Sequence, residues 1–588
     1  MDASKSHHVS ILLSSDGYSK EAKKTKSIWR WWNQLSRFQR SLVYMFSAAV
    51  LFTIVYFLPG YSENSIVDVN KAEVNTIKKD VLVNIRNDPR DVENDFNEIE
   101  NENQVLEEPA DVPVEEINNA KHVLARPNIG VQFSGVLDDR QQAVVDAFKH
   151  AWKGYRQFAW GHDHLKPMSE GYHDWFGLGL TIVDSLDTLY IMGLKKEFLE
   201  AREWVEKFLH FDKNRDVNLF EVTIRVLGGL LSTFHLSGDK MFLNKSIDLG
   251  DRLLPCFDTP SGVPFSDINL FTTKAHAPKW SPDSSTSEVT TIQLEFKDLS
   301  RSSGIFKYEE AVAKVAYHVH TLEKRDGLVP IFINANSGQF RSHSTVTLGA
   351  RGDSYYEYLL KQWIQTGKTI DYLRDDYIEA INGVQKHLVQ RTVPNGYLFI
   401  GELLVGGKDF KPKMDHLTCY LPGTLALGVH HGMPQSHMKL AEELMTTCYQ
   451  TYVQQPTFLA PEITYFNIHA DNSNDMYVKT NDAHNLLRPE FIESLWYMYQ
   501  ITKNATYQDW GWNIFQAFEK YTKVVNGYTS IGNVRNTANV RPKDLMESFF
   551  LSETLKYLYL LFSSNPKLLD IDKYVVNSEA HPLPIYSS

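Results

Sequence analysis

The sequence predicts an all-α fold from about residue 131 onward, and two observations carry this prediction. Apolar residues recur at positions i, i+3 and i+4, the period of an amphipathic helix, whereas convincing alternating strands are few. A loose repeat runs through the same region: one helix ends near a glycine or a polar turn, and an aromatic-led helix begins four or five residues later. Such turns occur at Gly193, Gly238, Gly304 and Lys503. The spacings are irregular, so we expect helical hairpins closed into a ring, with an irregular helical bundle as the alternative.

An uncharged apolar run at residues 41–58 predicts a membrane-spanning helix near the N-terminus. A helix of this length extends about 27 Å, enough for the thinner membranes of the early secretory pathway. Lysine and arginine precede the run and acidic residues follow it, so the positive-inside rule places the rest of the chain in the lumen. A cleaved signal peptide is the alternative, but the run starts late and lacks a small-residue cleavage site. We therefore expect a cytosolic tail (1–40) and a type II signal anchor (41–58).

The segment at 59–130 is polar and acidic, so it cannot bury enough apolar surface to fold and is expected to be a flexible stem. The net charge of −12, without a basic aromatic-rich patch, argues against a nucleic-acid partner. Two sequons, at Asn244 and Asn504, are glycosylation acceptors if the folded domain (131–588) is luminal.

Three cysteines, Cys256, Cys419 and Cys448, are too few for a disulfide scaffold. One bridge is possible, and Cys419–Cys448 is the natural candidate in an oxidising compartment. Composition and spacing alone do not fix the pairing.

The stretch Arg488-Pro489-Glu490 predicts a helix start with a glutamate in its first turn. Proline suits the first helical position because its missing N–H would be unpaired there. Glu490 would face the positive end of the helix dipole, and an apolar stripe at helical spacing follows it. Taken alone, this is a favourable first-turn charge.

Four other acidic residues have similar surroundings. Glu221 precedes Arg225 by four residues, which places both on one helix face. Asp353 lies at an apparent helix start, and Glu462 follows a proline. Glu553 follows Phe549 by four residues, so a helix would place both on one face. Two carboxylates on opposite faces of a sugar ring suffice for glycoside hydrolysis. One by one, however, each is better explained by helix capping or an ion pair.

Five blocks of sequence occur in order over about residues 135–588: DVNLFEVTIR (216–225), LGARGDSYYEY (348–358), KMDHLTC (413–419), LRPE (487–490) and EAHP (579–582). Together they resemble the signature blocks of class I α1,2-mannosidases, glycoside hydrolase family 47. The resemblance implies an (α/α)7 barrel, a bound Ca2+ ion, and inverting removal of terminal α1,2-linked mannose from high-mannose N-glycans. It also implies the Cys419–Cys448 disulfide, which leaves Cys256 free.

The same resemblance implies roles for individual residues. Glu490 matches the general base that activates the attacking water, and Glu221 matches the general acid, acting directly or through a water. Asp353 is the third catalytic acid and a candidate to share the acid function. An inverting mechanism predicts about 6.5–9.5 Å between the base and acid carboxyls. The positions implied to bind substrate are Arg225, Glu288, Arg351, His416, Glu462, Arg488, Glu493, Phe549, Glu553 and Glu579.

The chain departs from the family at the metal position. The family's calcium is bound by the hydroxyl and carbonyl of one threonine, and this chain has Ser578 there. Serine keeps both oxygen ligands but lacks the methyl group that restricts the side chain. We expect Ca2+ to bind still, and more weakly. The remaining ligands would be waters held by Glu490, Glu493, Glu553 and Glu579.

The resemblance makes Arg351 a sign of an endoplasmic reticulum enzyme, because those members of the family have arginine at this position whereas Golgi members have leucine. Arginine makes fixed bidentate contacts, so we expect preferential removal of the middle-branch mannose, in N-glycan processing and glycoprotein quality control. Two alternatives stay open: a lectin-like degradation factor with little hydrolysis, and a Golgi mannosidase of broader branch preference. The three acids and the cysteine pair favour the enzyme, in the membrane of the endoplasmic reticulum or early Golgi. The oligomeric state is not predicted.

Overall fold

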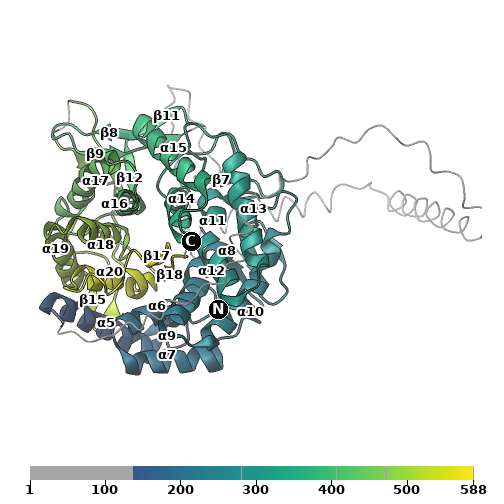
Figure 1. Cartoon of the computed structure of the whole chain (residues 1–588). Helices are drawn as coiled ribbons and strands as arrows, with labels where there is room; N and C mark the ends of the chain where they lie inside the picture. The colour runs from purple at the N-terminus through teal and green to yellow at the C-terminus, as the bar shows by residue number, and fades with distance from the viewer. Residues whose placement is uncertain (1–136, 280, 405–406, 471–472, 587–588) are drawn as a thin grey trace, which may run out of the picture. The chain divides into compact units, whose positions relative to one another are not determined.

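The computed structural model describes residues 137–586 except 280, 405–406 and 471–472. These residues belong to one compact unit, and Figure 1 shows its helices arranged around a central β-hairpin. The expected cytosolic tail, signal anchor and stem, residues 1–130, lie outside the described residues.

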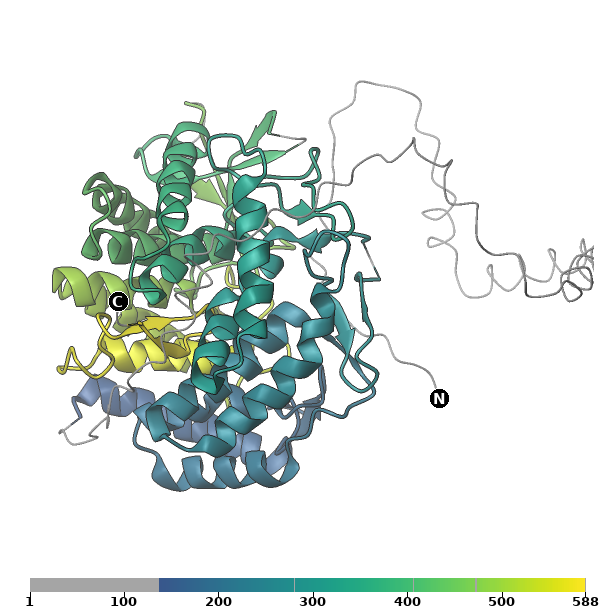
Figure 2. The same cartoon turned by 45° about the vertical axis from the view of Figure 1, so that its right-hand side comes forward.

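Most of the described chain consists of helices that pair with their neighbours in sequence. The pairs are α6 (Leu180–Ile191) with α7 (Lys195–Phe208), α9 (Gly228–Ser237) with α10 (Lys240–Leu253), α12 (Gln293–Ser303) with α13 (Lys307–Thr321), α14 (Asp353–Gln365) with α15 (Asp371–His387), α16 (Leu421–His430) with α17 (Ser436–Val453), and α18 (Glu490–Thr502) with α19 (Thr506–Tyr521). The two ends of the described chain form a further pair, because α5 (Asp139–Phe158) packs against α20 (Leu555–Leu561). Figure 2 shows this meeting of the blue and yellow segments. The helix-rich fold predicted from periodicity is confirmed.

One helix of each pair also packs against one helix of the next pair. In chain order α6 contacts α9, α9 contacts α12, and the contacts continue through α14, α16 and α18 to α20. The π-helical turn η4 (Phe550–Thr554), which leads into α20, packs back against α6. The packing contacts therefore run in a closed circuit around the unit.

The four turns expected from the sequence repeat all lie between paired helices. Gly238 and Gly304 are the C-caps of α9 and α12, with left-handed φ values of 74° and 76°. Lys503 caps α18 with φ 58°, and Gly193 follows the end of α6. A left-handed residue after the last helical turn satisfies free carbonyls and redirects the chain, which is why this signal locates the hairpins.

The sequence analysis overlooked many short strands, because a strand of two to four residues has too few positions to display alternation. Two antiparallel sheets have three strands, β3–β4–β5 and β12–β13–β14, and the others are two-stranded. The strands are β1 (His164–Lys166), β2 (Gly171–His173), β3 (Asp216–Asn218), β4 (Asp267–Asn269), β5 (Ala275–His276), β6 (Ser284–Ser285), β7 (Phe332–Ile333), β8 (Val389–Arg391), β9 (Leu398–Ile400), β10 (Glu402–Leu404), β11 (Asp409–Lys411), β12 (Lys413–Asp415), β13 (Ile463–Phe466), β14 (Met476–Tyr477), β15 (Lys523–Val524), β16 (Gly527–Tyr528), β17 (Tyr574–Val576) and β18 (Pro582–Pro584).

Short helical segments complete the fold. They are α8 (Leu219–Val222), the π-helical turn η1 (Thr223–Leu227), the 3-10 turns η2 (Leu254–Phe257) and η3 (His416–Tyr420), and α11 (Thr286–Thr290). All of them except η2 carry side chains of the site.

The hairpin of β17 and β18 is fully buried, with Val575 paired to Leu583. Strand β17 packs on α14, and β18 packs on α9 and α12. In the connecting loop, the Asn577 amide donates to the Ile224 carbonyl at 2.9 Å and to Glu295 at 2.8 Å. These bonds hold the loop that contains Ser578.

The predicted Cys419–Cys448 disulfide is present and joins η3 to α17, while Cys256 is free and buried. Both sequon asparagines, Asn244 on α10 and Asn504 in the turn after α18, are exposed. Among the described residues, one helical stretch, Leu219–Ser237, is long and apolar enough to cross a membrane. Because 83% of that window is buried inside the unit, it is a core helix by its packing.

Candidate active site

Glu490 is the first residue of α18, so the predicted helix start is confirmed, with Pro489 one position earlier as the N-cap. The Nδ1 atom of His416 lies 2.7 Å from one Glu490 carboxylate oxygen, and an Arg488 nitrogen lies 3.6 Å from the other. Burial alone would raise the pKa of Glu490, but the Arg488 charge and the His416 hydrogen bond lower it below its ordinary value. Glu490 is therefore held in the ionised form that a general base needs.

His416 is positioned from behind by Tyr452, a residue that the sequence analysis missed. The His416 Nε2 atom lies 2.7 Å from the buried Tyr452 hydroxyl. When the hydroxyl donates to Nε2, the Nδ1–H is left to donate to Glu490. His416 lies on η3 and Tyr452 on α17, the two elements that the Cys419–Cys448 disulfide joins. The disulfide thus supports the orientation of the imidazole.

Arg488 connects Glu490 to a second carboxylate, that of Glu462. The Arg488 guanidinium lies 2.9 Å from one oxygen of Glu462, and the Leu486 N–H donates to the other at 3.1 Å. Glu462 does not begin a helix, as its preceding proline suggested; it directly precedes β13. Sheet pairing with β12 decides that conformation.

The ring of Phe549 lies between two arginines of the site. The guanidinium carbons of Arg488 and Arg225 are each 5.6 Å from the ring centroid. Both are cation–π distances, and Phe549 is almost fully buried. The expected face shared with Glu553 is altered, because the intervening residues form the π-helical turn η4. Phe549 joins the surroundings of Glu490 to those of Glu221.

Arg225 lies in the π-helical turn η1 and is surrounded by carboxylates. Its Nε donates to Glu221 at 2.8 Å, its Nη1 donates to Glu579, and Asp184 lies at 3.8 Å. Glu221 itself is fixed by its backbone N–H, which the Asn218 side chain caps at 2.9 Å. Burial raises the pKa of Glu579 to about 8 despite the Arg225 charge. One cation among several buried acids leaves negative charge in excess.

Asp353 begins α14, as the sequence predicts. Its surroundings shift its pKa in the direction opposite to that of Glu490. Burial raises the pKa of Asp353 to about 7, and the negative charges of Glu357, Asp415 and Glu490 add to the effect. At neutral pH a substantial share of Asp353 is protonated. The site thus contains two acids whose pKa values are shifted in opposite directions.

Arg351 is held near Glu288 at the edge of the same network. Its Nη1 atom donates to the Ser285 hydroxyl at 2.6 Å and lies 3.6 Å from Glu288. The Asn218 side chain also donates to Glu288, at 3.4 Å, which links this pair to the cap of Glu221.

Three non-glycine residues of the site have left-handed backbone conformations, which sequence periodicity does not reveal. Arg351 has φ 74°, Leu487, before Arg488, has φ 66°, and Ala580, after Glu579, has φ 63°. Such conformations cost about 1–2 kcal/mol each for residues with a Cβ atom. The packing of the surrounding residues must therefore stabilise these strained backbone conformations, which occur at or next to the residues of the site.

Buried acids also gather near the predicted metal position. Burial raises the pKa of Glu493 to about 7, although Lys361 lies 3.2 Å away. Burial and the negative charges of Glu579 and Glu490 raise the pKa of Glu553. A set of buried carboxylates with too few cations suits a metal ion that would supply the missing positive charge.

Ser578, directly before Glu579 in the chain, offers a side-chain and a backbone oxygen atom as possible ligands. Its backbone N–H donates to the Tyr358 hydroxyl at 3.2 Å, but within the described part of the chain no hydrogen bond reaches its hydroxyl or its carbonyl. Hard cations such as Ca2+ take oxygen ligands of these types. The donor set around Ser578 therefore fits the predicted ion.

A fully buried group, which we call the sealed ion cluster, consists of Asp184, Asp187, Lys556 and His581. Lys556 lies 2.9 Å from Asp187, and His581 bridges Asp187 at 2.8 Å and Asp184 at 3.2 Å. The cluster touches the site through Arg225. Sequence reasoning missed it, although charged residues inside the apolar runs of α6 and α20 were an available signal.

Comparisons with known proteins show the family of this chain. The model of glycosyl hydrolase family 47 matches residues 147–585. Over 454 residues the chain is 59% identical to the endoplasmic reticulum mannosyl-oligosaccharide 1,2-alpha-mannosidase of Homo sapiens, with 77% of this chain and 65% of that protein covered. The rat protein of the same name is 59% identical over 454 residues, covering 76% of this chain and 69% of its own length. The chain thus spans about two thirds of these relatives.

A solved structure supports the same assignment. The alpha-1,2-mannosidase from Trichoderma reesei matches with a TM-score of 0.72 and 26% identity, over 77% of this chain and 100% of the other. The family match covers most of the described residues. The chain belongs to glycosyl hydrolase family 47.

Proposed function

We propose that this chain is a calcium-dependent, inverting exo-α1,2-mannosidase that trims terminal α1,2-linked mannose from high-mannose N-glycans. The observation that carries the proposal is the opposite pKa shift of two partly buried acids, lowered for Glu490 and raised for Asp353. The names of the mammalian relatives support the substrate class. The closed circuit of helix contacts supports an (α/α)7 barrel as the scaffold.

In the proposed mechanism Glu490 accepts a proton from the attacking water. Its lowered pKa keeps it ionised, and His416 and Arg488 fix its two oxygens. The departing glycosidic oxygen needs a proton, and Asp353 carries one near neutral pH. We therefore assign the acid function to Asp353, with Glu221, which the resemblance favours, in a supporting position held by Arg225. An inverting outcome predicts about 6.5–9.5 Å between the base and acid carboxyls.

The acid assignment is tested with two substrates that differ in their need for a proton. A glycan substrate requires protonation of the leaving oxygen, whereas α-mannosyl fluoride does not. We expect Asp353→Asn to lose far more activity on the glycan than on the fluoride, because only the first reaction needs the acid. If Glu221→Gln shows that selective loss and Asp353→Asn does not, the assignment is reversed.

Ser578 and the acids around it fit a calcium ion, which the Ser578 hydroxyl and carbonyl would bind directly. Glu490, Glu493, Glu553 and Glu579 would hold its waters. When bound, calcium supplies a fixed positive charge against which sugar hydroxyls can be oriented. The surplus of buried carboxylates and the two free Ser578 oxygens support this proposal.

Arg351 is proposed to direct the enzyme to the middle branch of the glycan. Its guanidinium is held between Ser285 and Glu288, so its direction is defined before substrate binds. The remaining predicted contacts of the glycan are with Arg225, His416, Glu462, Arg488 and Phe549. We expect Arg351→Leu to keep total hydrolysis within about tenfold but to broaden the branch preference, measured by separating the product isomers.

A role in glycoprotein quality control, and residence in the membrane of the endoplasmic reticulum or early Golgi, are part of the same proposal. The apolar segment at 41–58 and the positive charge before it support a type II anchor with the catalytic unit in the lumen. The names of the mammalian relatives support the compartment.

The deciding experiment uses the purified full chain in detergent and a free high-mannose glycan. We expect release of β-mannose, the inverted anomer, which a chelator abolishes and added calcium restores. Release from several branches at equal rates would favour a Golgi-type enzyme. Glycan binding without any release would favour a lectin and contradict the proposal.

A further inference from the structure

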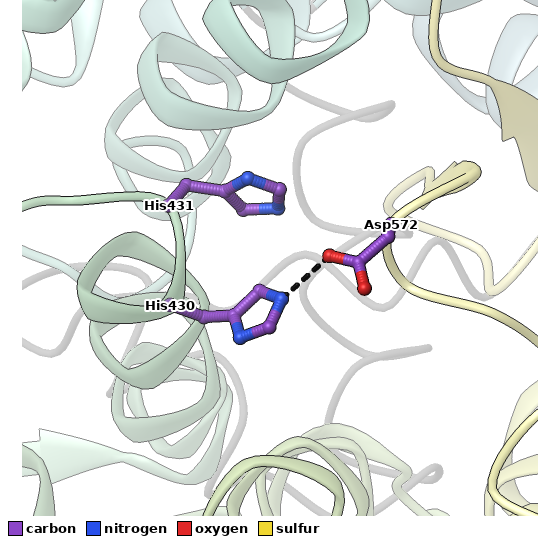
Figure 3. A group of neighbouring side chains, drawn as sticks. All are labelled: His430, His431 and Asp572. Atoms are coloured by element: carbon purple, nitrogen blue, oxygen red, sulfur yellow. Dashed lines mark hydrogen bonds and ion pairs between the residues drawn. The ribbon is translucent and has the colours of Figure 1, made fainter.

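Two histidines and an aspartate meet outside the proposed active site, where α16 ends. His430 is the last residue of α16, His431 is its C-cap, and Asp572 lies in the turn before β17. Figure 3 shows the two imidazoles and the carboxylate directed toward one another. One ligand-type atom from each of the three residues lies within 4.8 Å of the other two.

The position of His431 after the helix end makes this meeting possible. Consecutive residues inside a helix point about 100° apart, so two adjacent histidines do not normally share one ligand. Here the C-cap leaves the helical path, with φ −91° and ψ 8°, and the two rings approach to 5.1 Å between centroids. The backbone therefore brings both rings to the same place.

The hydrogen bonds of the group are incomplete. His430 Nε2 lies 2.7 Å from an Asp572 oxygen, a pairing that a helix C-terminus would also favour for a charged histidine. That pairing does not account for His431, whose Nε2 atom is buried and has no hydrogen-bond partner within the described residues. A buried nitrogen without a partner costs about 1–3 kcal/mol, so its placement needs an explanation.

We propose that His430, His431 and Asp572 bind a divalent transition-metal ion, with zinc as the expected occupant. Imidazole nitrogens and a carboxylate oxygen are zinc ligands, and three protein ligands leave a fourth position for water. Tetrahedral ligands at about 2.0–2.1 Å from zinc lie about 3.3 Å apart. The ion therefore separates the His430–Asp572 pair slightly and draws His431 inward.

The site is separate from the proposed calcium position. Helix α16 has ten residues and is therefore about 15 Å long, with His416 and Cys419 just before its first turn and His430 at its far end. Asp572 precedes β17, whose other end leads to Ser578. Zinc bound here would link the C-terminal end of α16 to the turn before β17. The opposite ends of these two elements lead to His416 and Ser578. The inference goes beyond the proposed hydrolysis and does not depend on it.

Lys368 gives the proposal an electrostatic test. Its ammonium group donates to the His431 carbonyl at 3.1 Å, and its charge opposes a cation bound by the ring. We expect Lys368→Met to tighten zinc binding by about 3- to 10-fold, the effect of removing one repulsive charge near a protein surface. Unchanged affinity would place bound zinc elsewhere.

The main experiment compares three forms of the full chain kept in saturating calcium: wild type, the double variant His430→Asn/His431→Asn, and a control double variant. The control, His210→Asn/His343→Asn, removes two exposed histidines that form hydrogen bonds only with residues close in sequence, Lys207 and Ser342, among the described residues. After treatment with a zinc-selective chelator, zinc is titrated by calorimetry and cobalt is followed by its visible absorption.

We expect wild type and the control to bind one zinc equivalent more than the double variant and to give the cobalt bands of a tetrahedral site. Zinc also raises their melting temperature, because it binds only the folded state. The melting temperature without zinc checks that the double variant is folded. Equal zinc stoichiometry in all three folded proteins overturns the proposal.

Discussion

The buried charges of this protein occur in two adjacent groups with opposite electrostatics. The sealed ion cluster contains Asp184, Asp187, Lys556 and His581, in which each carboxylate faces a cation or an imidazole. The second group, which we call the acid-rich site, contains Asp353, Glu490, Glu493, Glu553 and Glu579. Arg225 touches both, since it lies 3.8 Å from Asp184 and donates to Glu579.

The pKa values express the difference. In the sealed ion cluster, burial would raise the pKa of Asp187, but Lys556 and His581 lower it to about 2. In the acid-rich site, burial raises the pKa of Asp353 and Glu493 to about 7 and that of Glu579 to about 8. Burial of charge by itself is therefore not the mark of function here. The mark of function is a group of acids that outnumber the cations beside them, because a ligand, a proton or a metal ion is then needed to offset the remaining negative charge.

The largest expected effect comes from removing the one clearly ionised acid of the acid-rich site. Glu490→Gln keeps the shape but cannot accept a proton, so we expect mannose release to fall by about 10²- to 10⁴-fold. Glu443→Gln, at a partly exposed glutamate paired with Arg391, is the matched control and leaves the rate unchanged. A rate for Glu490→Gln near that of the control would remove Glu490 from the mechanism.

In the sealed ion cluster, removing a charge is expected to reduce folding stability rather than the catalytic rate. Lys556→Met leaves Asp187 buried without its cation, so we expect the free energy of unfolding to fall by about 3–5 kcal/mol. The same change at the partly exposed Lys523, which pairs with Glu519, is expected to cost about 1 kcal/mol or less. Both are measured by urea unfolding, and equal losses would mean that the two groups do not differ as described.

The calcium affinity of Ser578 variants tests whether the acid-rich site binds a metal ion. Ser578→Ala removes a side-chain oxygen beside the surplus acids, and we expect calcium affinity to fall by about 10- to 100-fold, the range seen when support of a metal site is lost. Ser578→Thr restricts the side-chain rotamer and is expected to bind calcium at least as tightly as wild type. Calorimetric titration with calcium measures both, and equal affinity of the Ala and wild-type chains would exclude the hydroxyl as a ligand.

The smallest expected effect is a difference in the pH dependence of stability. For Glu493 the folded-state pKa of about 7 lies above the ordinary 4.5, so the folded chain binds more protons and stability falls as pH rises through this interval. For Asp187 the folded-state pKa of about 2 lies below the ordinary 3.8, so its stabilisation is present at neutral pH and is lost as pH falls toward 2.

Thermal unfolding of chelator-treated protein between pH 4.5 and 8 measures the first of these trends. We expect the melting temperature to decline as pH rises, and saturating calcium to reduce the decline by offsetting the acid charge. A melting temperature that rises over this interval without calcium would contradict the raised pKa values of the acid-rich site.

Local signals predicted much of this architecture. Gly238 and Gly304 located hairpin turns because a left-handed cap needs a residue that tolerates positive φ, and that need is visible in the sequence. The helix starts at Asp353 and Glu490 were predictable from their neighbours alone. Glu462 was misplaced at a helix end, because its conformation follows from pairing of β13 with β12, a contact between distant segments.

The sequence by itself determined the helical hairpins, the family and the identity of the candidate acids, since periodicity, caps and ordered motifs are local properties of a chain. Only the tertiary structure decided which acid holds a proton. Asp353 and Glu490 each begin a helix, yet the pKa of one is raised and that of the other lowered. The reason is that a pKa depends on burial and on all surrounding charges. Arg488 and Glu357 are local in sequence, but His416 beside Glu490 and Asp415 near Asp353 come from remote segments that only folding brings close.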